Sequence, residues 1–231
     1  MKTRKTMVLV PFHGHIEPST ESCLDGLGQF GYPILRRAGV SAIDSARNEM
    51  VAEAMSLGYE SILFVDSDIL FHPRYVLDLE EHDLPIVCGG YVKKDRSGFA
   101  HIFDMSDEVA FGESGKLVPI IRCGMGFTLI KTAVFDMIKD KLNLPKCRLP
   151  GEKFTYPWFM PMTVEEKGVN YYRAEDYAFC DRARKAGFNI KCDTRLLLGH
   201  IGPYVYSVPD LEHMIIARSK NGVKEAFFKN K

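Results

Sequence analysis

The sequence ILFVDSD at residues 62–68 joins a short apolar run to two carboxylates that follow it directly. Four consecutive apolar residues are typical of a strand that is covered on both faces of its sheet. A helix-forming segment at 44–57 precedes this run and ends at Gly58, and a second apolar run follows at 85–92. Helix, turn and buried strand in alternation predict an α/β fold with a mostly parallel central sheet flanked by helices.

The alternation continues on both sides of this stretch. Further strands are predicted at 7–12, 117–122, 126–130 and 188–193, and further helices at 72–84, 132–142, 175–186 and from Asp210 onward. The stretch with glycines at 26, 28 and 31 is predicted to be irregular, and so is the segment 145–170, which is rich in Pro, Gly and aromatic residues. A loop as long as 145–170 in a compact domain is usually functional or disordered.

Length and composition predict one globular domain. The chain has 231 residues, of which 46% are hydrophobic and 26% charged, close to the globular average. Lys+Arg and Asp+Glu are both 30, so no overall field would draw the molecule to nucleic acid or to an anionic membrane. Binding must therefore come from local sites.

The sequence also bears on location. No segment reaches the ~18 apolar residues of a membrane span, and the short apolar run near the start is interrupted by Pro11. We therefore expect a soluble, cytoplasmic protein with no integral membrane segment. The alternative for the terminal helix from Asp210, whose lysines follow an apolar face, is peripheral attachment to a membrane. The six cysteines show no zinc-binding spacing and predict buried thiols in a reducing compartment.

Three groups of residues are candidates for chemistry. Asp66 and Asp68 can hold a divalent cation through oxygen ligands, although a polar turn explains the same pattern. Glu175 and Asp176 open a predicted helix, where either a general base or simple helix-dipole stabilisation accounts for them. His200 follows an apolar run and is either a structural histidine or an imidazole ligand to the same cation.

The order of these motifs resembles a family. ARN at 46–48, DSD at 66–68, GGY at 89–91, GMGFTLI at 124–130, Glu175-Asp176, CDRARKAGF at 180–188 and GH at 199–200 follow one another as in nucleotide-sugar-dependent GT-A glycosyltransferases. The likeness is to the large inverting family 2 and covers about residues 7–204. It implies a single Rossmann-like GT-A domain, with a nucleotide-binding half at about 1–94 and an acceptor-binding half at about 95–231.

The resemblance also implies roles for individual residues. Asp66 and Asp68 match the family's DxD motif, with Ser67 between them, and Mn²⁺ or Mg²⁺ is the implied cofactor. Arg47 matches a helix residue beside the nucleotide, and Pro11 ends the strand whose loop cradles the base. The remaining matches are Asp176, the catalytic base next to Glu175, and His200, an additional metal ligand.

Two further groups are less distinctive. Gly124 and Gly126 would let the backbone approach the nucleotide sugar closely, or they only form tight turns. Trp158 and Tyr156, in the loop FTYPWFMPM at 154–162, would contact the acceptor through their aromatic faces, or they pack over the core.

The function that follows is transfer of a sugar from a nucleotide diphosphate, with UDP as the default donor nucleotide, to an acceptor hydroxyl with inversion. The acceptor stays open among a glycan, a lipid-linked sugar, a protein and a modified nucleobase. One alternative is a sugar nucleotidyltransferase, although PFHGHIEPSTES at 11–22 lacks the Gly-rich, basic phosphate loop expected there. The other is a non-catalytic module that binds a nucleotide sugar or a glycan.

Overall fold

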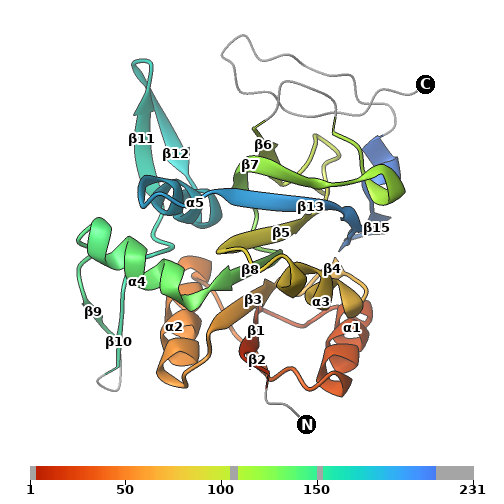
Figure 1. Cartoon of the computed structure of the whole chain (residues 1–231), viewed down its shortest axis with the longest axis horizontal. Coiled ribbons are helices and arrows are strands. Elements are labelled where there is room, and N and C mark those ends of the chain that lie inside the picture. The colour runs from red at the N-terminus through yellow and green to blue at the C-terminus, as the bar shows by residue number, and fades with distance from the viewer. Residues whose placement is uncertain (1–3, 105–108, 150–152, 212–231) are drawn as a thin grey trace.

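One mixed sheet of eight strands runs through the molecule (Figure 1). The computed structural model describes residues 4–104, 109–149 and 153–211. The strands of the sheet are β1 (Thr6–Pro11), β2 (Ile34–Arg37), β3 (Ser61–Val65), β5 (Ile86–Gly90), β6 (His101–Phe103), β7 (Leu117–Cys123), β8 (Phe127–Lys131) and β13 (Ile190–Leu197). They lie in the order β2-β1-β3-β8-β5-β13-β7-β6. Only β7 and β8 run against the common direction, since both pair antiparallel with each of their neighbours.

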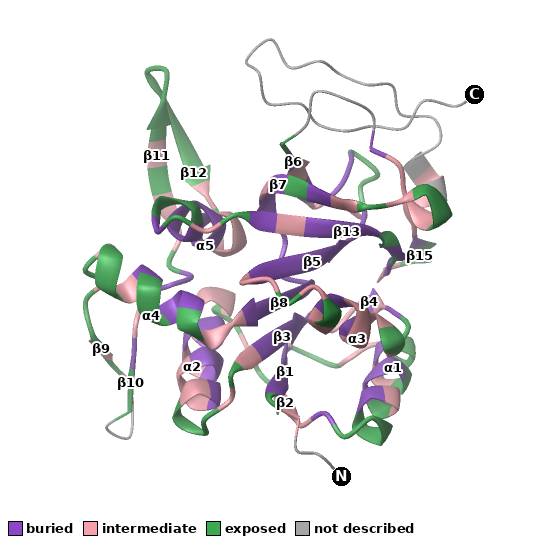
Figure 2. Ribbon diagram, in the orientation of Figure 1, coloured by how far each residue is buried: buried purple, intermediate pink, exposed green. Residues whose placement is uncertain are grey.

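Helices cover both faces of this sheet. They are α1 (Pro18–Gln29), α2 (Ile43–Ser56), α3 (Arg74–Glu81), α4 (Thr132–Lys141) and α5 (Glu175–Lys185). Alternate residues of β1 point to opposite faces: Met7 and Leu9 join the core under α2, α4 and α5, whereas Val8 and Val10 join the core under α1 and α3. β1 and β5 are therefore buried along their whole length, and β3 and β8 over all but one residue (Figure 2).

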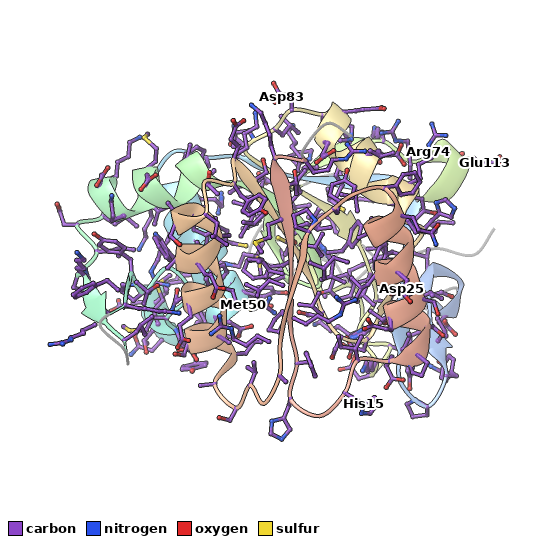
Figure 3. The ribbon with its side chains drawn as sticks, turned by 90° about the horizontal axis from the view of Figure 1, so that it is seen from below. His15, Asp25, Met50, Arg74, Asp83 and Glu113 are labelled. Atoms are coloured by element: carbon purple, nitrogen blue, oxygen red, sulfur yellow. The ribbon has the colours of Figure 1, made fainter. Side chains whose placement is uncertain are left out.

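The strands of the sheet lead to two opposite ends of the molecule. Seen from below, α2 with Met50 and α1 with Asp25 stand on either side of the strands (Figure 3). His15, in the loop after β1, and Asp83, just before β5, lie at opposite ends of the molecule (Figure 3). The loops that follow β1 and β3 thus emerge at the His15 end, the edge at which open α/β sheets bind their ligands.

The predicted α/β class, with a large central sheet flanked by helices, is confirmed. The predicted strands and helices appear at the expected places, with boundaries that differ by a few residues. The described part of the chain contains no helix long and apolar enough to cross a membrane. The predicted C-terminal helix from Asp210 falls almost wholly on residues 212–231, outside the described residues. The last described element is the 3-10 turn Val208–Leu211.

The prediction of irregular structure around Gly26 and Gly28 was wrong, because α1 and then β2 form there. Glycine disfavours a helix by about 1 kcal/mol relative to alanine, but packing outweighs that cost. A Cβ atom at Gly26 would lie 2.6 Å from Cγ of Pro73, so α1 can approach the start of α3 only where a side chain is missing.

The segment 145–170 was also predicted without regular structure, and it instead forms two small hairpins. They consist of β9 (Cys147–Arg148) with β10 (Phe154–Thr155) and of β11 (Met162–Glu166) with β12 (Val169–Arg173). The second hairpin projects from the body of the molecule (Figure 1) and is mostly exposed. The signal that went unused is the pair Lys167-Gly168, both at positive φ as in a two-residue hairpin turn, between the strand-forming runs MTV and VNYY.

Candidate functional site

A cleft of about 340 Å³ opens where β1 and β3 end. It is lined by Pro11, Phe12, His13, Val40, Ser41, Ile43, Arg47, Asp66, Ser67, Asp68 and Glu175. The structure therefore brings together, from three separate segments of the chain, most of the residues that the sequence predicts for donor and metal binding, and adds Glu175 from a fourth. The cleft lies outside the carboxyl ends of parallel strands, where α/β folds place their ligands.

The backbone of the Asp66-Ser67-Asp68 turn is fixed on both sides. The Asp66 N–H donates to the carbonyl oxygen of Gly126 at 3.0 Å, and the Ser67 carbonyl accepts from the N–H of Glu17 at 2.8 Å. These bonds join the turn to β8 and to the start of α1. The two carboxylates consequently extend from a rigid backbone, as a preorganised ligand site requires.

Arg47, on α2, lies among the acidic groups of the cleft. Its Nη2 donates to Oδ1 of Asp66 at 2.9 Å, and its Nε lies 3.7 Å from Oε1 of Glu175. The guanidinium is only 3% exposed and stacks 5.0 Å over the ring of Phe64. Burial acts to lower the pKa of Arg47, but Asp66, Glu175 and Asp176 together raise it above its usual value. Arg47 thus neutralises part of the acidic charge of the cleft.

Asp68 meets His200 through a small antiparallel sheet. The strand β4 (Ile69–Leu70) pairs with β14 (Gly199–Ile201), which in turn pairs with β15 (Val205–Tyr206). This places Nε2 of His200 at 3.5 Å from Oδ2 of Asp68. Nδ1 of His200 lies 2.8 Å from the carbonyl oxygen of Val92 and donates to it, so Nε2 is the nitrogen that faces Asp68.

Lys94 is a member of this site that the sequence analysis missed. Its Nζ donates to Oδ2 of Asp68 at 2.6 Å. Burial would raise the pKa of Asp68, but contacts with His200 and Lys94 outweigh it and keep that pKa below its usual value. The available signal was a basic residue just after the buried strand β5, whose end faces the same edge of the sheet as β3.

A second residue that the sequence analysis did not select is His13. It lines the cleft directly after β1, and its Nδ1 lies 3.1 Å from the carbonyl oxygen of Val40. That contact fixes the ring at the rim of the cleft beside Pro11, the residue predicted to end the strand under the base.

Asp176 carries the most perturbed carboxyl group near the cleft. Burial first, and then repulsion from Glu175, raise its pKa to about 7, while Arg47 and the backbone N–H of Tyr177 act in the opposite direction. That N–H donates to Oδ1 of Asp176 at 2.6 Å. A carboxyl group with a pKa near neutrality can exchange a proton at physiological pH, as a general base must.

Gly124 and Gly126 lie against a tyrosine. A Cβ atom at Gly124 would lie 2.2 Å from the hydroxyl of Tyr91, and one at Gly126 would lie 2.8 Å from it. The Gly126 N–H donates to the same hydroxyl at 3.1 Å. Close approach is therefore the reason for both glycines, but the group that approaches them in this structure is Tyr91, and neither glycine lines the cleft.

The structure does not favour acceptor binding by Trp158. Its side chain is 2% exposed, and Nε1 donates to the carbonyl oxygen of Phe135 at 2.9 Å, so the ring belongs to the core between α4 and α5. Tyr156 is partly buried beside it, with ring centroids 5.4 Å apart. This corrects the prediction for Trp158: an apolar ring with a satisfied N–H is more stable inside the core than facing water.

The donor atoms around Asp68 fit a divalent cation. A carboxylate oxygen and an imidazole nitrogen already lie 3.5 Å apart. Carboxylates bind both Mg²⁺ and Mn²⁺, whereas imidazole is a ligand of transition metals, so this pair suits Mn²⁺ better than Mg²⁺. Asp66, the third predicted ligand, is paired with Arg47 instead. The ammonium group of Lys94 occupies one face of Asp68 and would have to share or leave it.

Comparisons with known proteins point to the fold. No protein-family model and no curated protein matches the chain. A197 from STIV is similar in structure, with a TM-score of 0.53 at 16% identity over 99% of this chain and 95% of that one. S. aureus TarS 1-349 in complex with UDP-GlcNAc gives a TM-score of 0.41 at 12% identity, covering 87% of this chain and 57% of that one. A glycosyltransferase involved in glycosylation of the major capsid of PBCV-1 gives 0.33 at 12%, covering 59% and 65%. The likeness to A197 shows a shared fold, and the two weaker likenesses add nothing to it.

Proposed function

We propose that this protein is a divalent-metal-dependent glycosyltransferase that moves a sugar from a nucleotide diphosphate, most simply UDP, to an acceptor hydroxyl with inversion. In this proposal residues up to about 94 bind the donor, and the rest of the chain forms the acceptor side. The acceptor is left open among a glycan, a lipid-linked sugar, a protein and a modified nucleobase.

One observation carries the proposal. Residues chosen from the sequence for donor binding, namely Pro11, Arg47, Asp66, Ser67 and Asp68, line a single cleft together with Glu175. They come from segments far apart in the chain, so their meeting is not a consequence of sequence proximity. Asp176, next to Glu175, has the near-neutral pKa that a base needs.

The donor side of the mechanism rests on cations. Asp68 and His200, with Asp66 as a further candidate, would hold Mn²⁺ or Mg²⁺, which when bound neutralises charge on the departing diphosphate. In this proposal Lys94, next to Asp68, donates a hydrogen bond to the oxygens of that diphosphate. Arg47 holds Asp66 in place through its 2.9 Å contact, and the loop after Pro11 borders the base.

The acceptor side rests on Asp176. In its ionised form it would accept the proton of the acceptor hydroxyl as that oxygen attacks the anomeric carbon and the bond from that carbon to the diphosphate breaks. Glu175 is paired with Arg47 across 3.7 Å. Its role in this proposal is to raise the pKa of Asp176 through its negative charge.

The decisive experiment is calorimetric titration of UDP, GDP and their sugar conjugates into the full chain, with and without Mn²⁺. Binding that requires Mn²⁺ is expected for one nucleotide class, and Asp68→Ala should abolish it. Asp25→Ala, which removes an exposed carboxylate on α1 away from the cleft, serves as the matched control and should bind as the wild type does.

Absence of metal-dependent binding to any nucleotide would overturn the proposal. Binding alone, without turnover against a panel of acceptors, would instead favour the non-catalytic module. Product analysis separates the remaining alternative: a glycosyltransferase releases a nucleoside diphosphate, whereas a nucleotidyltransferase consumes a nucleoside triphosphate and a sugar phosphate and releases pyrophosphate.

A further inference from the structure

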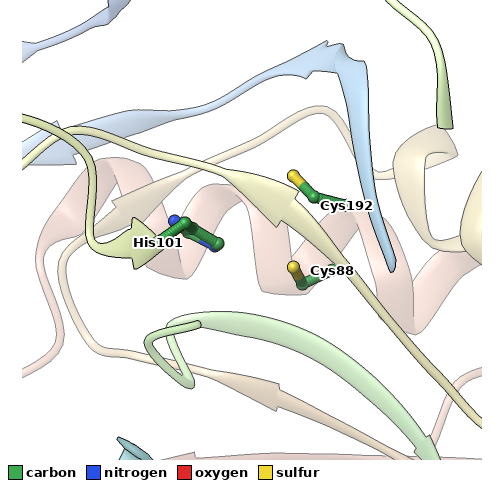
Figure 4. A group of neighbouring side chains, drawn as sticks. All are labelled: Cys88, His101 and Cys192. Carbon is green, nitrogen blue, oxygen red and sulfur yellow. The ribbon is translucent and has the colours of Figure 1, made fainter. Parts of the chain in front are cut away.

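Buried cysteines gather with one histidine in the core, away from the candidate cleft. Cys88 on β5 and Cys192 on β13 are register partners in neighbouring parallel strands. His101 on β6 faces them, and the ligand atoms of all three residues lie within 4.8 Å of one another (Figure 4). Both cysteines are 0% exposed and His101 is 4% exposed. No zinc-binding spacing is visible in the sequence because the three residues come from three different strands.

His101 is the unusual member of this group. Neither ring nitrogen has a hydrogen-bond partner in the described part of the chain, although the whole ring is buried. Burial lowers the pKa of His101. The backbone of Gly89 and of Tyr91 lies close to the ring and acts in the opposite direction, but neither forms a hydrogen bond with it. A buried imidazole is normally hydrogen-bonded, so an unpaired one needs an explanation.

We propose that Cys88, Cys192 and His101 form a structural site for a thiophilic metal ion, with Zn²⁺ as the expected occupant. Two sulfur atoms and one imidazole nitrogen are the ligand types that tetrahedral zinc sites use. Zn–S bonds of about 2.3 Å imply ligand atoms about 3.8 Å apart in a tetrahedron. The observed spread of up to 4.8 Å therefore closes with small side-chain movements.

Cys123 is the candidate for the fourth ligand, although it lies outside the group of three whose ligand atoms are within 4.8 Å of one another. It is the register partner of His101 in the β6–β7 pair, it is fully buried, and its Sγ lies 3.8 Å from Sγ of Cys180. Its thiol also contributes, after burial and together with Cys192, to raising the pKa of Cys88. Binding of Zn²⁺ by three thiolates and one neutral imidazole releases three thiol protons. The second nitrogen of His101 could then donate to the backbone of Gly89 or Tyr91.

The metal ion would cross-link three strands of the sheet. It would join β5, β13 and β6 next to the segment that follows β5 and carries Tyr91 and Lys94. The Tyr91 ring packs edge-on against both His101 and His200, with centroid distances of 5.1 and 5.3 Å. The buried site would thus hold the tyrosine that supports the candidate cleft, while taking no part in the proposed reaction.

The test measures metal in the full chain purified without chelators. Elemental analysis of the wild type is expected to find zinc in stoichiometric amount. Refolding with Co²⁺ should give the visible bands of a tetrahedral site and thiolate-to-cobalt charge transfer in the near ultraviolet. Removal of the metal should lower Tm, and Zn²⁺ should restore it.

Variants locate the site. Cys88→Ser and Cys192→Ser should each weaken the charge-transfer band, because one of the thiolate ligands is lost, and the double variant should weaken it further, whereas Cys23→Ser, which changes a buried thiol in the core on the opposite face of the sheet, should leave its intensity unchanged. Asp68→Ala should also keep it, which separates this site from the candidate cleft. If the serine variants fail to fold, the wild-type measurements still decide.

Three results would overturn the inference. They are a wild-type protein that neither carries zinc nor gains the cobalt bands, a charge-transfer band of unchanged intensity in folded Cys88→Ser, and an intact mass lower by two hydrogens that maps to a Cys88–Cys192 disulfide. None of these results bears on nucleotide binding at Asp68, so this inference and the proposed function fail independently.

Discussion

Nε2 of His200 lies 3.5 Å from Oδ2 of Asp68 because the strands that carry them are paired: Ile69 opposes His200 in the β4–β14 ladder. The Ile201 N–H also donates to the carbonyl oxygen of Asp68 at 2.7 Å. The backbone thus fixes the imidazole and the carboxylate relative to each other, independently of any ligand. Lys94 is the flexible member, since it reaches Asp68 from the end of β5 through a long side chain.

Removing the charge of Lys94 should strengthen metal binding at Asp68. In Lys94→Met the ammonium group no longer competes for Oδ2, and we expect the Kd for Mn²⁺ to fall by about tenfold, equivalent to about 1.4 kcal/mol. Titration followed by the electron paramagnetic resonance of free Mn²⁺ measures this directly. Lys93→Met is the matched control, and equal affinities in both variants would show that Lys94 does not compete.

Asp176 should destabilise the folded protein at alkaline pH. Its folded-state pKa of about 7 lies above the ordinary value of 3.8, so between these values the folded state binds more protons than the unfolded state. Stability from this group is therefore full below pH 4 and is lost as pH rises through 7. Asp176→Asn removes the penalty and should be more stable than the wild type at pH 8 by about 1 to 3 kcal/mol.

Urea unfolding of the two proteins at pH 5 and pH 8 checks this expectation. The stability difference between variant and wild type should be larger at pH 8, and Asp25→Asn, at an exposed position on α1, should show no such trend. A difference independent of pH would mean that the pKa of Asp176 is not raised in the folded state.

The same group should shape the pH dependence of sugar transfer. Only the ionised carboxylate can accept the acceptor proton, so kcat/KM should rise by about tenfold between pH 6 and pH 8. Glu175→Gln removes the second cause of the raised pKa and should shift the rising limb toward lower pH. A profile that keeps its midpoint in Glu175→Gln would assign the titration to another group.

The sequence predicted the framework of the site better than its details. The apolar run ending at Val65 and the first turn of α5 are local patterns, so Asp66, Asp68 and Asp176 could be placed at strand and helix ends without a structure. Lys94 could not, because its role depends on β5 ending at the same edge of the sheet as β3, with β8 between them. The buried state of Trp158 was equally invisible, since an aromatic residue in a Pro-rich loop suits either a lid or the core.

Long-range register explains the other omissions. Cys88, Cys192 and His101 lie on strands whose pairing no local spacing reveals, and α1 forms despite two glycines because Gly26 packs against Pro73. In each case tertiary contact decides what local propensity leaves open.

Arg47 should contribute more to stability than an arginine with similar partners nearer the surface. Arg47→Met leaves Asp66 and Glu175 without their cation, and we expect a loss of about 2 kcal/mol or more in the free energy of unfolding. Arg37 also contacts two carboxylates, Glu49 and Glu53, but its side chain is 30% exposed. Arg37→Met should therefore cost under about 1 kcal/mol, and equal losses in the two variants would contradict the central role of Arg47.

Gly124 should tolerate no side chain while Tyr91 keeps its hydroxyl. In Gly124→Ala the new Cβ would lie 2.2 Å from that oxygen and 3.2 Å from Cζ, so the buried tyrosine must shift, at a cost of about 1 to 3 kcal/mol. Tyr91→Phe alone also destabilises, because the Gly126 N–H loses its acceptor. In the double variant the worst clash is absent, and the loss should be smaller than the sum of the two single losses.

Urea unfolding of the four proteins in this cycle gives the coupling energy. Gly28→Ala is the control for adding a methyl group at a glycine, since nothing lies within 4 Å of its Cβ position in α1, and it should be neutral or slightly stabilising. Additive losses from Gly124→Ala and Tyr91→Phe would mean that the tyrosine hydroxyl is not what excludes a side chain there.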